Sequence, residues 1–68
     1  MEKGKKYTLK KPIYTTHQVG VQILWLEGGV FTIINFKDNM VFMAPESDRL
    51  VMISMSQDLF VEYFSELN

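Results

Sequence analysis

The stretch that most constrains the fold of this chain is residues 19–36, in which two apolar segments flank Gly28 and Gly29. Both segments are rich in β-branched and aromatic residues, which favour strands. Glycine tolerates the positive φ that a tight two-residue turn requires. The pattern therefore predicts an antiparallel hairpin with strands near residues 21–26 and 30–36 and a turn at the two glycines.

The position of this turn fixes which residues of the predicted hairpin face one another. The expected pairs are Leu26 with Phe31, Trp25 with Thr32, Ile23 with Ile34, and Gln22 with Asn35. Because successive side chains point to opposite sides of a strand, both faces of this hairpin are apolar. Both faces therefore need cover from another part of the chain or from a partner.

The chain has 68 residues, which is the size of one small domain. A domain of this length buries only about 60% of its unfolded surface and is marginally stable alone. The sequence has no Cys that could form a disulfide, while its hydrophobic content of 47% argues against disorder. We expect a flexible basic N-terminus over residues 1–6 and a single β-rich domain over residues 7–68.

Charge is distributed unevenly along the chain. Residues 1–11 hold five lysines and one acid, a net charge of +4, whereas the remaining residues hold two bases and seven acids, a net charge of −5. Such a basic arm can contact a polyanion or the acidic part of another copy. The favoured interpretation is a solvated chain end, because chain ends are commonly mobile.

The sequence shows no targeting segment and no membrane span. Its basic start is not followed by the apolar segment of a secretion signal. The longest apolar stretch, residues 23–26, is far shorter than a membrane span. A cytoplasmic protein is expected.

Short strands are predicted on either side of the hairpin. A strand over residues 7–10 is interrupted by Pro12, which has no N–H for a sheet, and resumes over 13–16. His17 and Gln18 are expected to form a short connection. The remaining predicted elements are a bend at Gly20, a turn at 37–39, a strand at 40–44, a turn at 45–48 and a strand at 49–55.

Residues 57–67 predict a terminal helix. Ser56 can cap its first N–H groups, and Phe60 and Phe64 lie on one apolar stripe. Residues 59–63 also alternate in the manner of a strand, which is the competing interpretation. The helix is favoured because the acidic residues of this segment share one i, i+4 row.

Short strands with tight turns and a final helix indicate a mainly β fold. We expect a small SH3-like or Sm-like barrel, or a rolled antiparallel sheet of about five strands, closed by the C-terminal helix. Residues 26–40 resemble the Sm-like pattern of a glycine, a later aspartate and a methionine. The spacing differs from that pattern, and Val41 stands where an asparagine usually follows the methionine.

No catalytic, cofactor or metal site is expected. His17 is the only histidine, and no residue spacing supplies it with a nucleophile and an acid or with further metal ligands. Gly28 and Gly29 lack the lysine and the following helix of a phosphate-binding loop.

The expected function is that of a non-enzymatic protein-interaction module, a small regulator or inhibitor that docks on another protein. Large apolar patches are rare on soluble monomers, so the two-sided apolar strands predict a homodimer or higher oligomer. The small size suggests a phage or mobile-element origin. The predicted interface residues are Trp25, Phe31, Ile33, Phe42 and Met52.

The alternative function is binding of RNA or single-stranded nucleic acid. Lysines neutralise phosphates, and exposed aromatic rings stack on bases. The residues that would make these contacts are Lys3, Lys5, Lys6, Lys10, Lys11, Tyr7 and Tyr14. The acidic remainder of the chain and its single Arg argue against sequence readout of a duplex.

Overall fold

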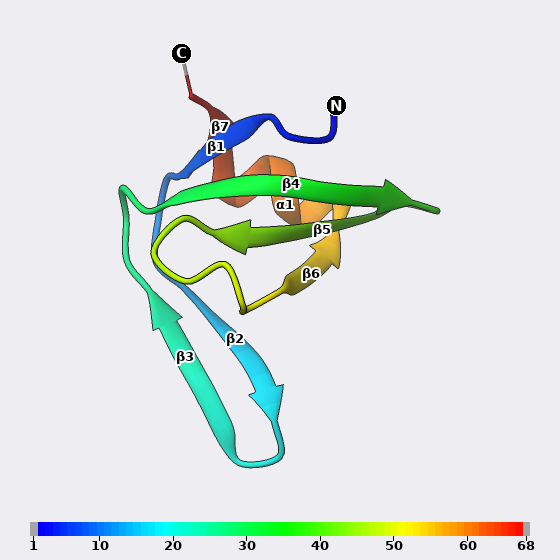
Figure 1. Ribbon diagram of the computed structural model, residues 1–68. Helices are drawn as coiled ribbons and strands as arrows, with labels where there is room; N and C mark the ends of the chain where they lie inside the picture. The colour runs from blue at the N-terminus through cyan, green and yellow to red at the C-terminus, as the bar shows by residue number, and fades with distance from the viewer. Residues whose placement is uncertain (1, 68) are drawn as a thin grey trace.

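The computed structural model of the chain describes residues 2–67 (Figure 1). This part of the chain forms seven strands and one helix. Their bounds are β1 Lys6–Leu9, β2 Ile13–Gln18, β3 Val21–Trp25, β4 Val30–Lys37, β5 Met40–Pro45, β6 Ile53–Ser56, α1 Gln57–Tyr63 and β7 Phe64–Glu66.

The strands form two antiparallel sheets, which confirms the mainly β prediction in its coarse form. One sheet has five strands in the order β6-β5-β4-β1-β7, and the other consists of β2 and β3 alone. In Figure 1 the two-stranded sheet projects away from the larger sheet as a ribbon, and α1 lies behind β4 and β5. The helix found within residues 2–67 is too short to cross a lipid bilayer.

The predicted hairpin across Gly28 and Gly29 is wrong. β3 pairs with β2 and not with β4, and Ile13 lies opposite Trp25. None of the four expected pairs between residues 21–26 and β4 forms, because these segments belong to different sheets. Local sequence patterns do not distinguish two strands that pair with each other from two strands that pair with others.

The real hairpin joins β2 to β3 through Val19 and Gly20. Gly20 has a φ of 78°, and a positive φ at the second central position of a type II turn suits glycine. His17 lies within β2 and not in a connection. The register of the β2–β3 pair shifts between Thr16 and Gln18, on either side of His17. This shift is a bulge, which adds one residue to the strand.

The two predicted turn glycines form the corner between the ribbon and the larger sheet. The Gly28 N–H donates to the carbonyl of Leu9 at 2.9 Å, and the Leu9 N–H donates to the carbonyl of Gly29 at 2.8 Å. Gly28 has a φ of 93°. After this corner β4 pairs with β1, with Tyr7 opposite Phe31, and Phe31 enters the core.

The predicted turn at residues 37–39 is confirmed. Asp38 and Asn39 have φ values of 51° and 68°, as the mirror-image turns of tight hairpins require. β5 follows directly, with Met40 opposite Lys37. The register of the β4–β5 pair shifts between Ile33 and Asn35.

The strand predicted at residues 49–55 is shorter in the structure. β6 begins only at Ile53, and residues 46–52 form the loop that connects it to β5. Three hydrogen bonds of Asp48 hold this loop. Its N–H donates to the Pro45 carbonyl, while its carbonyl and its Oδ1 accept from Val51 and Leu50.

The helix is present but ends before the predicted residue 67. Ser56 caps it as predicted, since its Oγ accepts from the Leu59 N–H at 3.2 Å. The helix stops at Tyr63, and the chain becomes extended at Phe64 with a φ of −123° and a ψ of 150°. Pairing of β7 with β1 places Phe64 opposite Leu9. Residues 59–63, whose alternation suggested a strand, lie in the helix, and the short strand comes after them.

The N-terminal segment takes part in the sheet. The sequence predicts a flexible stretch over residues 1–6, but Lys6 already belongs to β1. The Gly4 N–H donates to the carbonyl of Ile33 at 2.7 Å, and the Ile33 N–H donates to the carbonyl of Lys5 at 2.9 Å. The sheet therefore begins inside the predicted tail.

The core lies between the larger sheet and α1. Phe60 and Phe64 are both buried, as predicted from their stripe. Their rings stack with centroids 5.0 Å apart, and Phe31 meets Phe64 edge-on at 5.2 Å. The buried apolar cluster consists of Leu9, Phe31, Ile33, Val41, Met43, Ile53, Met55, Phe60 and Phe64.

Candidate protein-contact surface

The ribbon of β2 and β3 is the feature of the structure that stands out as a contact surface. Residues 12–26, which contain it, include no Asp, Glu, Lys or Arg. Each of its strands pairs only with the other, so the outer edge of each lacks a strand partner within residues 2–67. Natural proteins usually protect such edges with charges or proline, and here the strands carry neither.

The inner face of the ribbon packs toward the body of the protein. Trp25 meets Phe31 edge-on with centroids 5.5 Å apart. The Trp25 indole N–H donates to Thr15 Oγ1 at 2.7 Å, and the same oxygen lies 2.7 Å from His17 Nε2. The two contacts of Thr15 are internal to the ribbon, whereas the contact of Trp25 with Phe31 joins the ribbon to the larger sheet at its base, where Ile13 also packs against the core.

The outer face of the ribbon is exposed, with apolar residues toward its base and the pair Thr16 and Gln22 toward its tip. Tyr14 and Leu24 lie directly opposite one another in the strand pair, and they are 66% and 44% exposed. Leu26 follows Leu24 by two residues and is 66% exposed. We refer to these three residues, Tyr14, Leu24 and Leu26, as the ribbon strip.

A pocket lies at the base of the ribbon, where the strip ends. It has a volume of about 280 Å³ and includes Leu26 of the ribbon strip in its wall. We refer to it as the Trp25 pocket. Its other walls include Trp25, Val30, Phe31, Pro45, Glu46 and Ser47.

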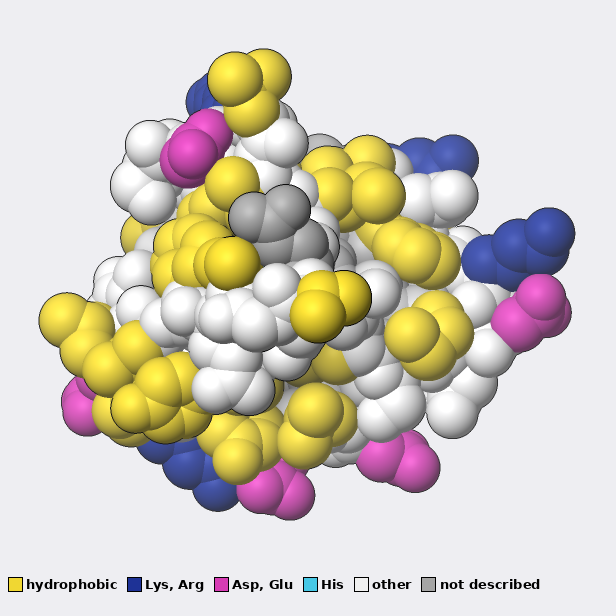
Figure 2. Space-filling view, turned by 90° about the horizontal axis from the view of Figure 1, so that it is seen from below, with side chains coloured by type: hydrophobic (Ala, Val, Ile, Leu, Met, Phe, Trp, Pro, Cys, Tyr) yellow, Lys and Arg dark blue, Asp and Glu magenta, His cyan; other side chains and the backbone are white. Residues whose placement is uncertain are grey.

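Figure 2 views the molecule from the side toward which the ribbon projects. Hydrophobic side chains and uncharged atoms fill the middle of this view, while acidic and basic side chains lie around its margin. Depletion of charged side chains at the centre, with charged side chains around it, is typical of a protein interface.

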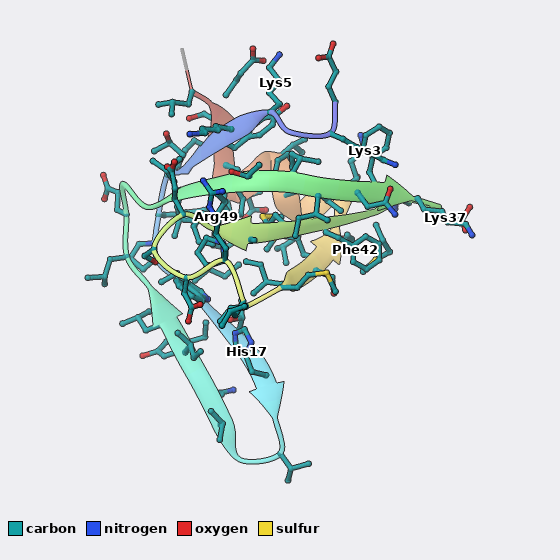
Figure 3. The ribbon with its side chains drawn as sticks, viewed as in Figure 1. Lys3, Lys5, His17, Lys37, Phe42 and Arg49 are labelled. Carbon is teal, nitrogen blue, oxygen red and sulfur yellow. The ribbon has the colours of Figure 1, made fainter. Side chains whose placement is uncertain are left out.

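The predicted interface residues do not share one surface. Trp25 lines the pocket, and Met52 is 59% exposed on the loop before β6. Phe42 is half-buried on β5, toward the end of the sheet that carries Lys37 (Figure 3). Phe31 and Ile33 were expected at the interface, but both are 1% exposed within the core, because their side of β4 faces α1.

The basic N-terminal segment is largely neutralised by acids of the same chain. Lys5 pairs with Glu66 at 2.7 Å, Lys6 pairs with Glu46 at 2.7 Å, and Lys11 pairs with Glu62 at 3.1 Å. Lys10 donates to the carbonyl of Val61 at 3.3 Å. Lys3 makes no ion pair within residues 2–67.

Two of these pairs shift the pKa of a partner. The hydrogen bond to Glu66 raises the pKa of Lys5 above its ordinary value of 10.5. The hydrogen bond from Lys6, with the positive charge of Lys6 and Arg49, lowers the pKa of Glu46 below its ordinary value of 4.5. Both groups are exposed, so solvent screens these pairs.

The two tyrosines predicted to stack on bases lie in different environments. Tyr7 is half-buried and meets the Phe60 ring edge-on at 4.8 Å. Tyr14 belongs to the ribbon strip and is exposed. Of the two tyrosines, only Tyr14 is therefore exposed enough to stack on a base.

His17 takes part in the ribbon and not in a cluster of ionisable groups. Figure 3 places it on β2, where it faces Trp25 at a centroid distance of 6.2 Å. Within residues 2–67 no three His, Asp or Glu side chains come together in a way that could hold a metal ion.

Sequence reasoning missed Leu24, Leu26 and the exposed Leu50 as surface residues. A signal for the first two exists in the sequence, since Leu24 and Leu26 lie in a long stretch without a charged residue.

Comparison of the chain with protein-family models, with curated proteins and with solved structures finds no match.

Proposed function

We propose that the protein is a non-enzymatic interaction module that associates with itself and docks on another protein, as a small regulator or inhibitor. The observation that carries this proposal is the uncharged, exposed ribbon strip that ends at the Trp25 pocket. Exposed apolar patches rimmed by polar groups mark interaction sites, and aromatic or aliphatic anchors in pockets supply most of the binding energy of an interface.

We also propose that the fold is a small SH3-like or Sm-like barrel that is not fully closed. The five strands of the larger sheet support this proposal, since sequence-distant β1 and β7 pair beside β4. Helix α1 supports it as well, because it connects the two edge strands, β6 and β7, and contacts both.

Nucleic-acid binding remains the alternative function. The ion pairs of Lys5, Lys6 and Lys11 reduce the positive charge that would attract phosphates. Arg49, Lys37 and Lys3 make no ion pair within residues 2–67, and Figure 3 shows Arg49 and Lys37 toward opposite ends of the larger sheet. Lys3 is drawn toward the same end as Lys37, so Arg49 lies apart from the other two cations, and this separation favours the protein-contact proposal.

The proposal is tested by capture of partners from a lysate of the organism that encodes the protein. A tagged wild-type chain is compared with a variant that combines Tyr14→Thr and Leu24→Thr, which keep β-propensity but remove the apolar strip. Val61→Thr is the matched control, because Val61 is 58% exposed on α1 and outside the strip. Each sample is split and treated with or without nuclease.

The expected result is a protein retained by the wild type and by the control, lost from the strip variant, and indifferent to nuclease. Equal capture by the strip variant would show that the strip is not the contact surface. Release of the captured material by nuclease would favour the alternative function.

A further inference from the structure

We propose that the Trp25 pocket receives Leu50 from a second copy of this chain, and that Leu50 of the first copy enters the pocket of the second. This inference rests on the proposed self-association and names the contact that produces it. It follows from the exposure of Leu50, the size and position of the pocket, and the charges beside each.

Leu50 is 97% exposed although it lies on a loop with defined hydrogen bonds. The Leu50 N–H donates to Asp48 Oδ1 at 3.1 Å, and the Val51 N–H donates to the Asp48 carbonyl at 3.2 Å. An aspartate that bonds the backbone two residues ahead is a common way to hold a turn. The loop therefore presents a leucine side chain to solvent in a fixed place.

The Trp25 pocket is suited to one side chain of this kind. Its volume of about 280 Å³ is just below the usual range of small-molecule sites. Its walls are mainly apolar, with Trp25, Phe31 and Pro45 among them. A single aliphatic side chain fits such a space better than a charged group, which would lose its hydration there.

The loop and the pocket lie close together on the chain surface. Ser47 lines the pocket, and Leu50 follows it by three residues, so their Cα atoms are at most about 11 Å apart. In a two-fold dimer each copy offers the same patch to the other. A patch that holds both an exposed leucine and an apolar pocket can therefore form the same contact twice.

Charges beside the two elements are complementary. Arg49 precedes Leu50, and Figure 3 shows it toward the end of the sheet that holds the pocket. Glu27 follows the pocket residue Leu26. Neither Arg49 nor Glu27 makes an ion pair within residues 2–67, so Arg49 of one copy can meet Glu27 of the other when Leu50 enters the pocket.

Sedimentation equilibrium tests the contribution of Leu50. We expect the wild type to be a dimer at about 100 µM, with a dissociation constant of about 1 µM. Leu50→Ser should weaken the dimer about 100-fold, since two leucines are lost and burial of each is worth about a factor of ten. Val61→Ser, at another exposed apolar position, should leave the dissociation constant unchanged.

The outcomes separate this inference from the proposed function. A dimer that Leu50→Ser does not weaken overturns the pocket contact and leaves self-association standing. A wild-type chain that is monomeric at about 100 µM overturns both. Docking on another protein is judged separately by the capture experiment.

Disulfide trapping tests the position of the contact directly, because the natural chain has no Cys. Chains with Leu50→Cys are mixed under oxidising conditions with chains that carry Ser47→Cys and a tag of different mass. We expect a mixed disulfide, which requires Cα atoms about 4.4–6.8 Å apart. Equal yield when Val61→Cys replaces Leu50→Cys would overturn the proposed contact.

Discussion

Replacement of Phe64 by alanine tests how α1 and β7 hold the core together. Phe64 is 3% exposed at the point where the helix becomes a strand. Its ring stacks on Phe60 at 5.0 Å and receives the edge contact of Phe31 at 5.2 Å. The variant therefore leaves a cavity beneath both the helix and the pairing of β7 with β1.

The expected cost is large relative to the stability of the domain. A buried Phe→Ala change costs about 3–5 kcal/mol. At about 0.05–0.15 kcal/mol per residue, a chain of 68 residues has a free energy of unfolding of only about 3–10 kcal/mol. Phe64→Ala should therefore remove between about a third and all of that stability. Phe64→Leu, which loses two ring contacts but keeps most of the volume, should cost about 1–3 kcal/mol.

Urea denaturation followed by fluorescence provides the measurement. Trp25 is the only tryptophan and packs on Phe31, so its emission reports on the core. All variants are compared at one protein concentration, because self-association adds to apparent stability. Val61→Ala, at an exposed position of the same helix, should change the free energy of unfolding by no more than about 0.5 kcal/mol. If Phe64→Ala shifts the midpoint no more than Val61→Ala does, the described core packing is wrong.

Three further predictions concern local features. Ser56→Ala removes the helix cap and should lower the free energy of unfolding by about 1 kcal/mol in the same urea assay; an unchanged midpoint would contradict the cap. Gly28→Val should cost about 1–2 kcal/mol, because the φ of 93° is unfavourable for any residue with a Cβ, and a neutral result would contradict the corner geometry. Because Lys6 lowers the pKa of Glu46, the stabilisation by this pair is present above pH 4.5 and is lost as the pH falls through the lowered pKa. NMR titration of the Glu46 side chain should give a midpoint below 4.5 that moves upward in Lys6→Gln.

The sequence predicts the positions of most strands better than their partners. Alternation and β-branched residues reveal β3 and β4, because these properties depend on neighbouring residues alone. The choice of partner depends on burial, and the pairing of β4 with β1 buries Phe31 against Phe64 and Trp25. Gly28 serves either arrangement, since both need a positive φ at this position.

The candidate surface is harder to predict for the same reason. Phe31 and Ile33 are as apolar as Leu24 and Leu26, and the pairing of the strands decides which pair is exposed. Leu50 was expected within a strand, but the hydrogen bonds of Asp48 keep it in a loop. The core strands β5 and β6 are uncharged as well, but the uncharged stretch over residues 12–26 is the longest in the sequence, and its length can be read without knowledge of the pairing.

The pairing of β1 with β7 brings the two ends of the chain together. Tyr7 lies opposite Glu66, the Leu67 N–H donates to the carbonyl of Lys6 at 3.1 Å, and both ends leave from the same side of the fold in Figure 1. A short linker from residue 67 to residue 5 would therefore make β7 and β1 an ordinary hairpin. New termini could be opened between Val19 and Gly20, at the tip of the ribbon. Such a circular permutant would make the pairing of β1 with β7 local and the pairing of β2 with β3 the one of greatest sequence separation. Because local contacts speed folding, its folding rate compared with that of the natural chain would show which of these two pairings forms first.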